Sequence, residues 1–125
     1  MADWTTDELG KIDAADELEI AARRPDGTLH PYVTIWVVRV GDDLYVRSYH
    51  GREGAWFRSV LRRPEGHIRA GGVERDVTFA ESGDVGRVAI DQAYQAKYAS
   101  RYARNFVDPM VSPGAAATTL RLIAG

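Results

Sequence analysis

Cysteine is absent from this sequence of 125 residues, so disulfide bonds and thiol catalysis are both excluded. Long apolar runs are absent as well, since none approaches the roughly 18 residues of a membrane-spanning helix. The start of the chain has neither the basic region nor the apolar region of a signal peptide. We therefore expect a cytoplasmic protein that does not act at a membrane.

A strong excess of charge is also missing. Lys and Arg number 16 and Asp and Glu 18, which gives a formal net charge of −2. This balance provides no electrostatic basis for general binding to nucleic acid or to membranes. Arginines nevertheless concentrate between residues 47 and 75, while the first twenty residues are mostly acidic. That asymmetry favours a local anionic small-molecule ligand.

The signatures of several common active sites are missing too. The 3 histidines, His30, His50 and His67, lack the spacing of paired metal ligands, so we expect no metal site. No serine lies in the Gly-x-Ser-x-Gly elbow of covalent acyl chemistry. The glycine clusters match neither the dinucleotide-binding fingerprint nor the phosphate-binding loop of nucleotide hydrolases.

What the sequence does contain is a series of short apolar segments separated by turn signals. Thr5 and Glu8 form a capping box, which predicts a surface helix that runs to about Ala15. Apolar patterns then predict six short strands, and Gly71-Gly72 marks a hairpin turn. The expected strands are residues 18–23, 32–40 (buried on both faces), 44–49, the two arms of a hairpin over 67–81, and 117–124.

Two more helices complete the pattern. The first is a short helix over residues 55–63, which Pro64 ends. The second is a long helix over residues 84–103 with an N-cap at Asp84. Because tight turns join most strands, the sheet should be antiparallel. We predict a single domain over residues 1–125, mainly β with flanking helices, built as a six-stranded antiparallel barrel.

Residues 48–63 have the clearest chemical potential. Gly51 and Gly54 precede a helix whose first turn has unpaired N–H groups and a partial positive charge. Three nearby side chains can donate hydrogen bonds to an anion: Ser48, His50 and Arg52. Two interpretations stay open at this level, an anion-binding cradle or a glycine-containing turn between a strand and a helix.

The aromatic residues also allow two interpretations. Tyr94, Tyr98 and Tyr102 recur every four residues and should share one helix face. This row either packs against the barrel or stands beside a flat ligand, where the hydroxyls could polarise a carbonyl. Trp56 is most simply an anchor for the short helix.

Residues 22–79 carry a pattern of segments in a recognisable order. RRPDGTLHPYVTIWVV is similar to the basic glycine turn and strand of deazaflavin (F420)-dependent nitroreductase-like proteins. LYVRSYHGREGAWFRSVLRRPEGHIRAGG is similar to their strand, glycine loop, tryptophan helix and following strand. The chain thus resembles the split β-barrel superfamily that binds FMN or F420 and includes pyridoxamine phosphate oxidase. The bacterial DUF2255 family within it resembles nearly the whole chain, including DELGKID and DPMVSP.

The resemblance implies the residues of a cofactor site. Basic residues of the first turn and the loop before the tryptophan helix would bind the cofactor: Arg23, Arg24, Ser48, His50, Gly51, Arg52 and Trp56. The flavin or deazaflavin ring would lie over the strand that contains Thr34 and Trp36. Tyr98 and Tyr102 would be the catalytic residues on the substrate side.

The function that the resemblance implies is an oxidoreductase. It would use F420 or FMN to pass a hydride to a small conjugated acceptor such as a quinone, a nitroaromatic or an enone. A homodimer is also expected, since split barrels commonly pair.

Two departures from the family pattern keep an alternative open. The basic glycine turn of the family appears here only as Arg23-Arg24-Pro25-Asp26-Gly27. The loop that carries lysine in the family is shortened to residues 50–54, where Glu53 would repel a phosphate. The alternative is a split barrel that has lost the redox cofactor. It would act as a small-molecule binding module or as a cofactor-free isomerase or cyclase, with three acid–base candidates: His50, Tyr98 and Asp108.

Overall fold

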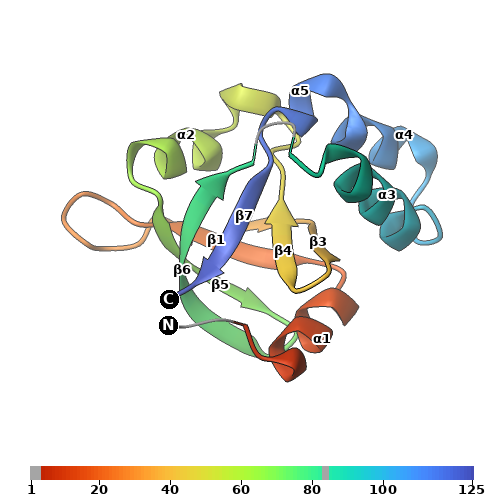
Figure 1. Cartoon of the computed structure of the whole chain (residues 1–125). Coiled ribbons are helices and arrows are strands. Elements are labelled where there is room, and N and C mark those ends of the chain that lie inside the picture. Colours follow the sequence, from red (N-terminus) through yellow and green to blue (C-terminus); the bar gives the residue numbers. More distant parts are fainter. Residues whose placement is uncertain (1–3, 83–84) are drawn as a thin grey trace.

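One antiparallel sheet, with the strand order β2-β1-β5-β6-β7-β4-β3, dominates the structure (Figure 1). The computed structural model describes residues 4–82 and 85–125. The strands are β1 (Leu18–Ala22), β2 (Val33–Ile35), β3 (Val37–Val40), β4 (Asp43–Val46), β5 (Glu65–Ala70), β6 (Val73–Glu81) and β7 (Leu120–Ala124). The prediction of a mainly β, antiparallel fold with flanking helices is confirmed, but the predicted number of six strands is wrong, because the described residues form seven.

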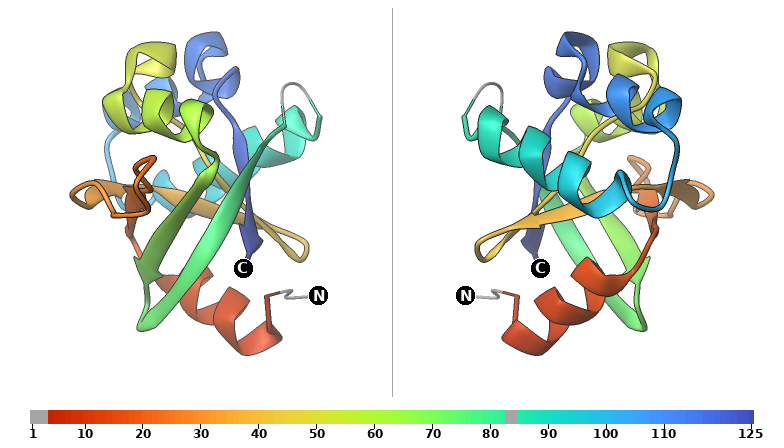
Figure 2. Two further views of the ribbon diagram at one scale, coloured as in Figure 1. Left: turned by 90° about the vertical axis from the view of Figure 1, so that its left-hand side faces the viewer. Right: turned by 90° about the vertical axis from the view of Figure 1, so that its right-hand side faces the viewer.

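The extra strand arises from a bend at Trp36. The two edge strands, β2 and β3, follow each other in the sequence and are separated by this residue alone. β2 pairs with β1, whereas β3 pairs with β4 on the other side of the sheet. The single strand predicted over residues 32–40 is therefore divided between two neighbours. The bend brings the two edges of the sheet together, so the sheet forms a nearly closed barrel (Figure 2).

Burial along this bent strand also differs from the prediction. Val37 and Val38 of β3 are buried, as expected for a strand covered on both faces. Val33 and Thr34 of β2 are exposed, so the expectation of full burial is wrong for this half. The reason is that α3 packs against the outer side of β3, whereas β2 lies at the other edge of the sheet, away from this helix.

Helices cover both ends and one side of the barrel. Helix α1 (Thr6–Ala14) lies at one end, and α2 (Ala55–Arg62) and α5 (Pro113–Ala116) lie at the other (Figures 1 and 2). Helix α3 (Arg87–Tyr98) packs against β3, and α4 (Arg104–Val107) follows it. Two 3-10 helices, η1 (Gly51–Glu53) and η2 (Asp108–Val111), complete the fold. None of the helices among the described residues is long and apolar enough to cross a membrane.

The predicted capping box of α1 is confirmed. The Thr5 hydroxyl accepts a hydrogen bond from the Glu8 backbone N–H at 3.1 Å, and the Glu8 carboxylate accepts one from the Thr5 N–H at 3.0 Å. Leu9 and Ile12 are buried against the end of the barrel. The surface helix expected from the sequence therefore also closes one end of the core.

The predicted hairpin around Gly71-Gly72 is confirmed as well. Ala70 of β5 lies opposite Val73 of β6, so the two glycines form the whole loop. Their φ angles are +58° and +86°, values that glycine adopts without steric cost. Positive φ at both central residues characterises the two-residue turns that match the twist of antiparallel strands.

The long helix expected over residues 84–103 is shorter in the structure. Asp84, its predicted N-cap, lies outside the described residues. The helix α3 ends at Tyr98, and Tyr102 lies in the turn that follows. Between this turn and β7 the chain forms the short helices α4, η2 and α5, which the sequence analysis did not predict. The strand predicted from residue 117 begins three residues later, after α5.

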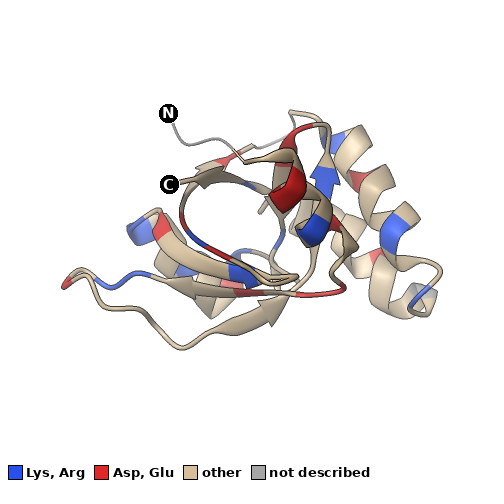
Figure 3. Ribbon diagram, turned by 90° about the horizontal axis from the view of Figure 1, so that it is seen from below, with Lys and Arg blue, Asp and Glu red and all other residues tan. Residues whose placement is uncertain are grey.

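Apolar side chains form two separate layers. The barrel interior holds one cluster, which includes Leu18, Phe57 and Leu122. A second cluster lies between the outer side of β3 and the helices α3 and η2, and it contains Tyr94 and Tyr98. Basic and acidic residues are interspersed over the barrel and the helices (Figure 3). The second layer matters for function, because it forms the back wall of the site described next.

Candidate functional site

A pocket with aromatic walls opens beside the bend at Trp36. Its volume is about 320 Å³, within the range of roughly 300–1,000 Å³ that small-molecule sites occupy. The lining comes from the bent strand, from the chain after β4, from the first turn of α2 and from the α4–η2 segment: residues 33–36, Arg47, Tyr49, His50, Trp56, Phe106 and Met110. Most of this lining is apolar, with a small number of polar groups, as is typical of ligand sites.

Four residues of the predicted cofactor site meet in this pocket. Thr34 and Trp36 come from the bent strand, His50 from the loop after β4, and Trp56 from α2. They lie together because the bend carries the strand past the loop before α2. The structure therefore brings together the residues predicted for the ring and two of those predicted for the loop.

The predicted basic turn lies elsewhere. Arg23 donates to the Gly27 carbonyl at 2.6 Å and forms an ion pair with Asp76 at 3.2 Å. Arg24 donates to the Leu29 carbonyl at 2.9 Å. Neither arginine lines the aromatic pocket. Both side chains stabilise the turn between β1 and β2 and the neighbouring strand β6.

The loop before α2 is compact. Ser48 is buried, and its backbone N–H donates to the Thr118 hydroxyl at 2.9 Å. Gly54 packs directly over the Ser48 hydroxyl, so a Cβ at position 54 would overlap with Ser48 Oγ. Gly51 has a φ of +64°, the left-handed conformation that favours glycine. The two glycines thus serve the close packing of the loop.

Arg52 extends from this loop into solvent. Its guanidinium is 3.9 Å from the Glu81 carboxylate, and the two side chains are each 57% exposed. An exposed pair at this distance contributes little to stability. The guanidinium also lies over the Phe57 ring, 5.5 Å from its centroid. These two loose contacts leave the Arg52 side chain able to bind an anion near the mouth of the loop.

The tyrosines of the predicted catalytic pair lie behind Trp36. The Tyr98 ring stacks on the indole with centroids 4.0 Å apart and an angle of 7° between the planes. Tyr102 packs on the same indole at 4.9 Å. Neither tyrosine lines the pocket, so both act on it through the position of Trp36.

Hydrogen bonds hold Tyr98 in this position. Its hydroxyl accepts from the Val37 N–H at 3.2 Å and donates to the Asp16 carbonyl at 2.8 Å. Burial raises the pKa of Tyr98 above its ordinary value, so the hydroxyl stays protonated at neutral pH. These contacts describe a side chain that fixes the pocket wall.

Lys97, the neighbour of Tyr98, is also partly desolvated. Its ammonium group donates to the Val37 carbonyl at 2.8 Å. Burial lowers the pKa of Lys97 to about 8, and the nearby charges of Asp13 and Arg101 act in opposite directions. The apolar layer behind the pocket therefore shields the Tyr98 hydroxyl, and in part the Lys97 ammonium group, from water.

Arg47 is a charged residue of the pocket that the sequence analysis missed, as it missed the apolar lining residues Val33, Ile35, Phe106 and Met110. The Arg47 side chain is 0% exposed, although arginine is almost never fully buried unless it is paired. Asp91 on α3 supplies the ion pair at 2.6 Å. On the sequence, Arg47 alternates with Leu44 and Val46 in a strand whose other face should meet solvent, and no local signal marks it as buried.

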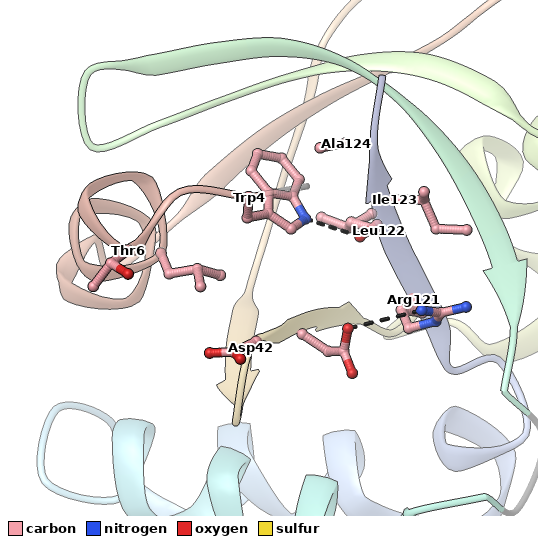
Figure 4. A pocket seen from close by; sticks show the side chains of 9 residues that line it. Trp4, Thr6, Asp42, Arg121, Leu122, Ile123 and Ala124 are labelled. Atoms are coloured by element: carbon pink, nitrogen blue, oxygen red, sulfur yellow. Dashed lines mark hydrogen bonds and ion pairs between the residues drawn. The ribbon is translucent and has the colours of Figure 1, made fainter. Parts of the chain in front are cut away.

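A second cavity, of about 380 Å³, lies near the opposite end of the barrel (Figure 4). Trp4 lines it and donates from its indole N–H to the Leu122 carbonyl at 3.0 Å. Arg121 and Asp43 face each other across it at 3.8 Å. Arg121 and Asp43 are about half exposed, Asp42 is almost fully exposed, and none of the residues predicted for the site lies in this cavity. Among the described residues, no group of three His, Asp or Glu side chains is arranged to hold a metal ion.

Comparison with known families identifies the chain. A bacterial family described as "Uncharacterized protein conserved in bacteria (DUF2255)" matches residues 8–122. The chain belongs to the DUF2255 family. No curated protein matches it. The family assignment made from the sequence is thus confirmed over almost the whole chain.

Several solved structures share the fold of this DUF2255 protein. The conserved hypothetical protein Rv2991 from Mycobacterium tuberculosis has a TM-score of 0.67 at 15% identity, over 99% of this chain and 84% of that one. A putative pyridoxamine 5'-phosphate oxidase from Listeria innocua scores 0.60 at 14% identity, over 94% and 88%. A protein titled F420 Reductase scores 0.55 at 14% identity, over 92% and 89%. Identities this low show a shared fold, and the chemistry rests on the pocket itself.

The pocket of this DUF2255 chain can hold one end of a flat ligand. Trp36 and Trp56 offer ring surfaces for stacking. Thr34 and His50 can donate hydrogen bonds, and Arg47 adds a charged group to a lining that contains no carboxylate. The arrangement can bind and orient a conjugated molecule that carries oxygen acceptors.

Proposed function

We propose that this DUF2255 protein is a flavin- or deazaflavin-dependent oxidoreductase. It would bind FMN or F420 and pass a hydride to a small conjugated acceptor such as a quinone, a nitroaromatic or an enone. The observation that carries the proposal is the aromatic pocket, in which Thr34, Trp36, His50 and Trp56 meet. The shared fold of a putative pyridoxamine 5'-phosphate oxidase and of an F420 Reductase supports the same class of ligand.

The residues in and around the pocket suit the ring of FMN or F420 better than they suit its phosphate. The pocket volume and the tryptophan walls suit a flat conjugated ring. For the phosphate, His50 and Arg52 are available beside the first turn of α2, whose N-cap residue Gly54 makes no side-chain cap. Arg23 and Arg24 are held in their own turn. The proposal therefore assigns phosphate binding to His50 and Arg52.

When bound, the cofactor would supply the hydride chemistry. The protein would supply the position of the ring, because Trp36 is fixed from behind by Tyr98 and Tyr102. Thr34 and His50 would donate hydrogen bonds to polar atoms of the ligand, and the aromatic walls would exclude water from it.

Direct binding tests this proposal. Purified protein is mixed separately with FMN and with F420, and fluorescence and thermal unfolding are followed. A ligand present at 100 times its Kd should add about 2.7 kcal/mol to the free energy of unfolding. If neither cofactor changes the unfolding temperature or its own fluorescence, the proposal fails.

An Arg52→Ala variant tests the phosphate assignment. A hydrogen bond to a charged group contributes about 1.5–3 kcal/mol, so the Kd for FMN should rise by roughly tenfold to a hundredfold. Arg58→Ala is the matched control, because Arg58 is also an exposed arginine, on α2 and outside the loop that holds Arg52. Equal Kd values for wild type and Arg52→Ala, measured by fluorescence titration, would remove Arg52 from the site.

A second candidate function is a cofactor-free binding module, or an isomerase or cyclase. It is favoured by the internal contacts of Arg23, Arg24 and Ser48, three residues that the resemblance assigned to cofactor binding. Of its acid–base candidates, His50 lines the pocket, whereas Tyr98 is buried behind it. This candidate predicts that Arg52→Ala has little effect on ligand binding and that FMN and F420 do not bind.

The proposed assembly is a homodimer. Val33, Tyr49 and Phe106 are exposed apolar residues around the pocket mouth, with exposed fractions of 40%, 50% and 52%. A second copy over this face would bury them and cover the free edge of β2. Light scattering after gel filtration should give twice the chain mass of 13.8 kDa, and a value equal to the chain mass would exclude the dimer.

A further inference from the structure

Arg47 has a guanidinium that the fold satisfies on two nitrogens and leaves open on the third. Its Nε donates to the Thr119 hydroxyl at 2.9 Å. Its Nη1 donates to the Asp91 carboxylate at 2.6 Å and to the Met110 carbonyl at 2.8 Å. Its Nη2 is buried and has no hydrogen-bond partner among the described residues. A charged donor that is buried and unpaired is costly, which makes it a rare feature in a native structure.

The unpaired nitrogen, Nη2, is part of a side chain that lines the aromatic pocket. Arg47 itself lines the pocket, and so does Met110, whose carbonyl binds the same guanidinium. No carboxylate lines this pocket. An oxygen atom of a ligand is therefore the natural partner for Nη2.

The local charge balance favours the same kind of ligand. Asp91 is shared by two guanidinium groups, since Arg87 lies 3.5 Å from its second oxygen. One carboxylate thus faces two guanidinium groups, of which Arg87 is partly exposed and Arg47 lies over the Tyr94 ring at 5.2 Å from its centroid. The carboxylate therefore does not fully balance the positive charge at this wall. Arg47 is fully buried, so that charge is poorly screened by water. An electron-rich or anionic oxygen is stabilised at such a place.

The position of the guanidinium is fixed in advance. Contacts to α3, η2 and the start of β7 hold three of its N–H bonds, so little conformational freedom remains to be lost when a ligand binds. A planar guanidinium held in this way presents its remaining edge in one direction. A lysine at the same position could not reproduce that edge, because an ammonium group is a point charge on a flexible chain.

We propose that Arg47 binds the inner end of the pocket's ligand, which is a flat conjugated molecule with a carbonyl or carboxylate oxygen that accepts a hydrogen bond from Nη2. The inference rests on the proposed function for the use of this pocket. It adds which chemical group the inner end of the ligand carries. Two sources share that chemistry. One is the carbonyl edge of a flavin or deazaflavin ring, and the other is a free aromatic acid.

A pair of small probes tests this on the wild-type protein. Indole-3-carboxylate and indole share a flat ring and differ in the carboxylate. NMR spectra of the arginine side chains follow each titration, together with FMN as a third ligand. Indole-3-carboxylate should bind at least tenfold more tightly than indole and should shift the Arg47 Nε–H signal. FMN should shift the same signal if its ring carbonyls reach Arg47.

Variants then assign the effect to the residue. Arg47→Lys keeps the charge and should lose the preference for the acid. Arg121→Met is the matched control, because Arg121 is 44% exposed and lines the other cavity, so this variant should keep the preference. Circular dichroism checks folding. If Arg47→Lys does not fold, the probe titrations on wild-type protein decide the question.

The outcomes separate this inference from the proposed function. Binding of the acid through Arg47 without binding of FMN or F420 supports the inference and removes the oxidoreductase proposal. Binding of FMN with an unmoved Arg47 signal and no preference for the acid supports the cofactor and overturns the inference. Equal affinity for the two indoles, or no binding of any ligand, also overturns it.

Discussion

Two cavities of the molecule have similar volumes, about 380 and 320 Å³, and differ in whether their charged groups have partners. In the cavity near α1, Arg121 and Asp43 form a pair, and each side chain is nearly half exposed. In the aromatic pocket, Arg47 is fully buried and keeps one nitrogen unpaired. The charges of Arg121 and Asp43 are paired with each other and exposed to solvent, whereas Nη2 of Arg47 is the donor for which we propose a ligand oxygen.

The difference comes from what lies behind each cavity. The first is a gap between α1 and the end of β7, where Trp4 seals the barrel core. The second is backed by the aromatic layer under α3, in which Tyr98 and Lys97 are bonded to the backbone of Val37. The volumes of the two cavities therefore do not distinguish them. They differ in whether the polar groups of the lining already have hydrogen-bond partners.

A Trp4→Ala variant should produce the largest effect on stability and none on the pocket. It removes a large side chain that packs on the core and a hydrogen bond to Leu122, so the free energy of unfolding should fall by about 3 kcal/mol. Urea unfolding measures the loss. Trp4→Phe, which keeps most of the apolar surface, should lose less. A large change in the Kd of any pocket ligand would contradict the separation of the two cavities.

A Tyr98→Phe variant should have an intermediate effect. The substitution leaves the Val37 N–H and the Asp16 carbonyl without their buried partner, which should cost about 2 kcal/mol. Tyr45→Phe is the control, since its hydroxyl forms no hydrogen bond with the part of the chain that the structure describes and its ring is only partly buried. If Tyr98→Phe instead keeps full stability and abolishes turnover, Tyr98 is catalytic, as the family resemblance implied.

The smallest effect is a pH dependence that should come from Lys97. Because burial lowers its pKa from 10.5 to about 8, the native state loses this proton at a lower pH than the unfolded state does. Between pH 8 and 10.5 the unfolded state binds more protons, so the wild type should gain stability with rising pH relative to Lys97→Met. Unfolding measured at pH 7, 8.5 and 10 tests this. Lys11→Met, at an exposed lysine, should show no such change.

Features fixed by a few neighbouring residues could be predicted from the sequence. The capping box needs only Thr5 and Glu8, and the hairpin needs only the two glycines, whose positive φ angles other residues rarely adopt. The short helix α5 is also fixed by a few neighbouring residues, although it was not predicted. Ser112 caps it and Pro113 occupies its first turn, a combination that marks helix starts.

Features that depend on distant partners could not be predicted. The apolar run through Trp36 is continuous, and its division into two strands depends on which strands lie beside each half. The burial of Arg47 depends on η2 and α3, which follow it by more than 40 residues. The family resemblance pointed to Thr34 and Trp36, which line the aromatic pocket, and it did not point to Arg47, which no local pattern distinguishes.

The bend at Trp36 has a consequence for how the family can vary in length. Successive strand residues point to opposite faces, so one inserted or deleted residue there would turn β3 inside out relative to β4. Val37 and Val38 would exchange sides, and the Trp36 ring would leave its place on Tyr98. Homologues should therefore keep an invariant spacing across this join, even where the surrounding turns lengthen freely. The number of residues between β2 and β3 is thus set by closure of the barrel, and it can be checked in any sequence of the family.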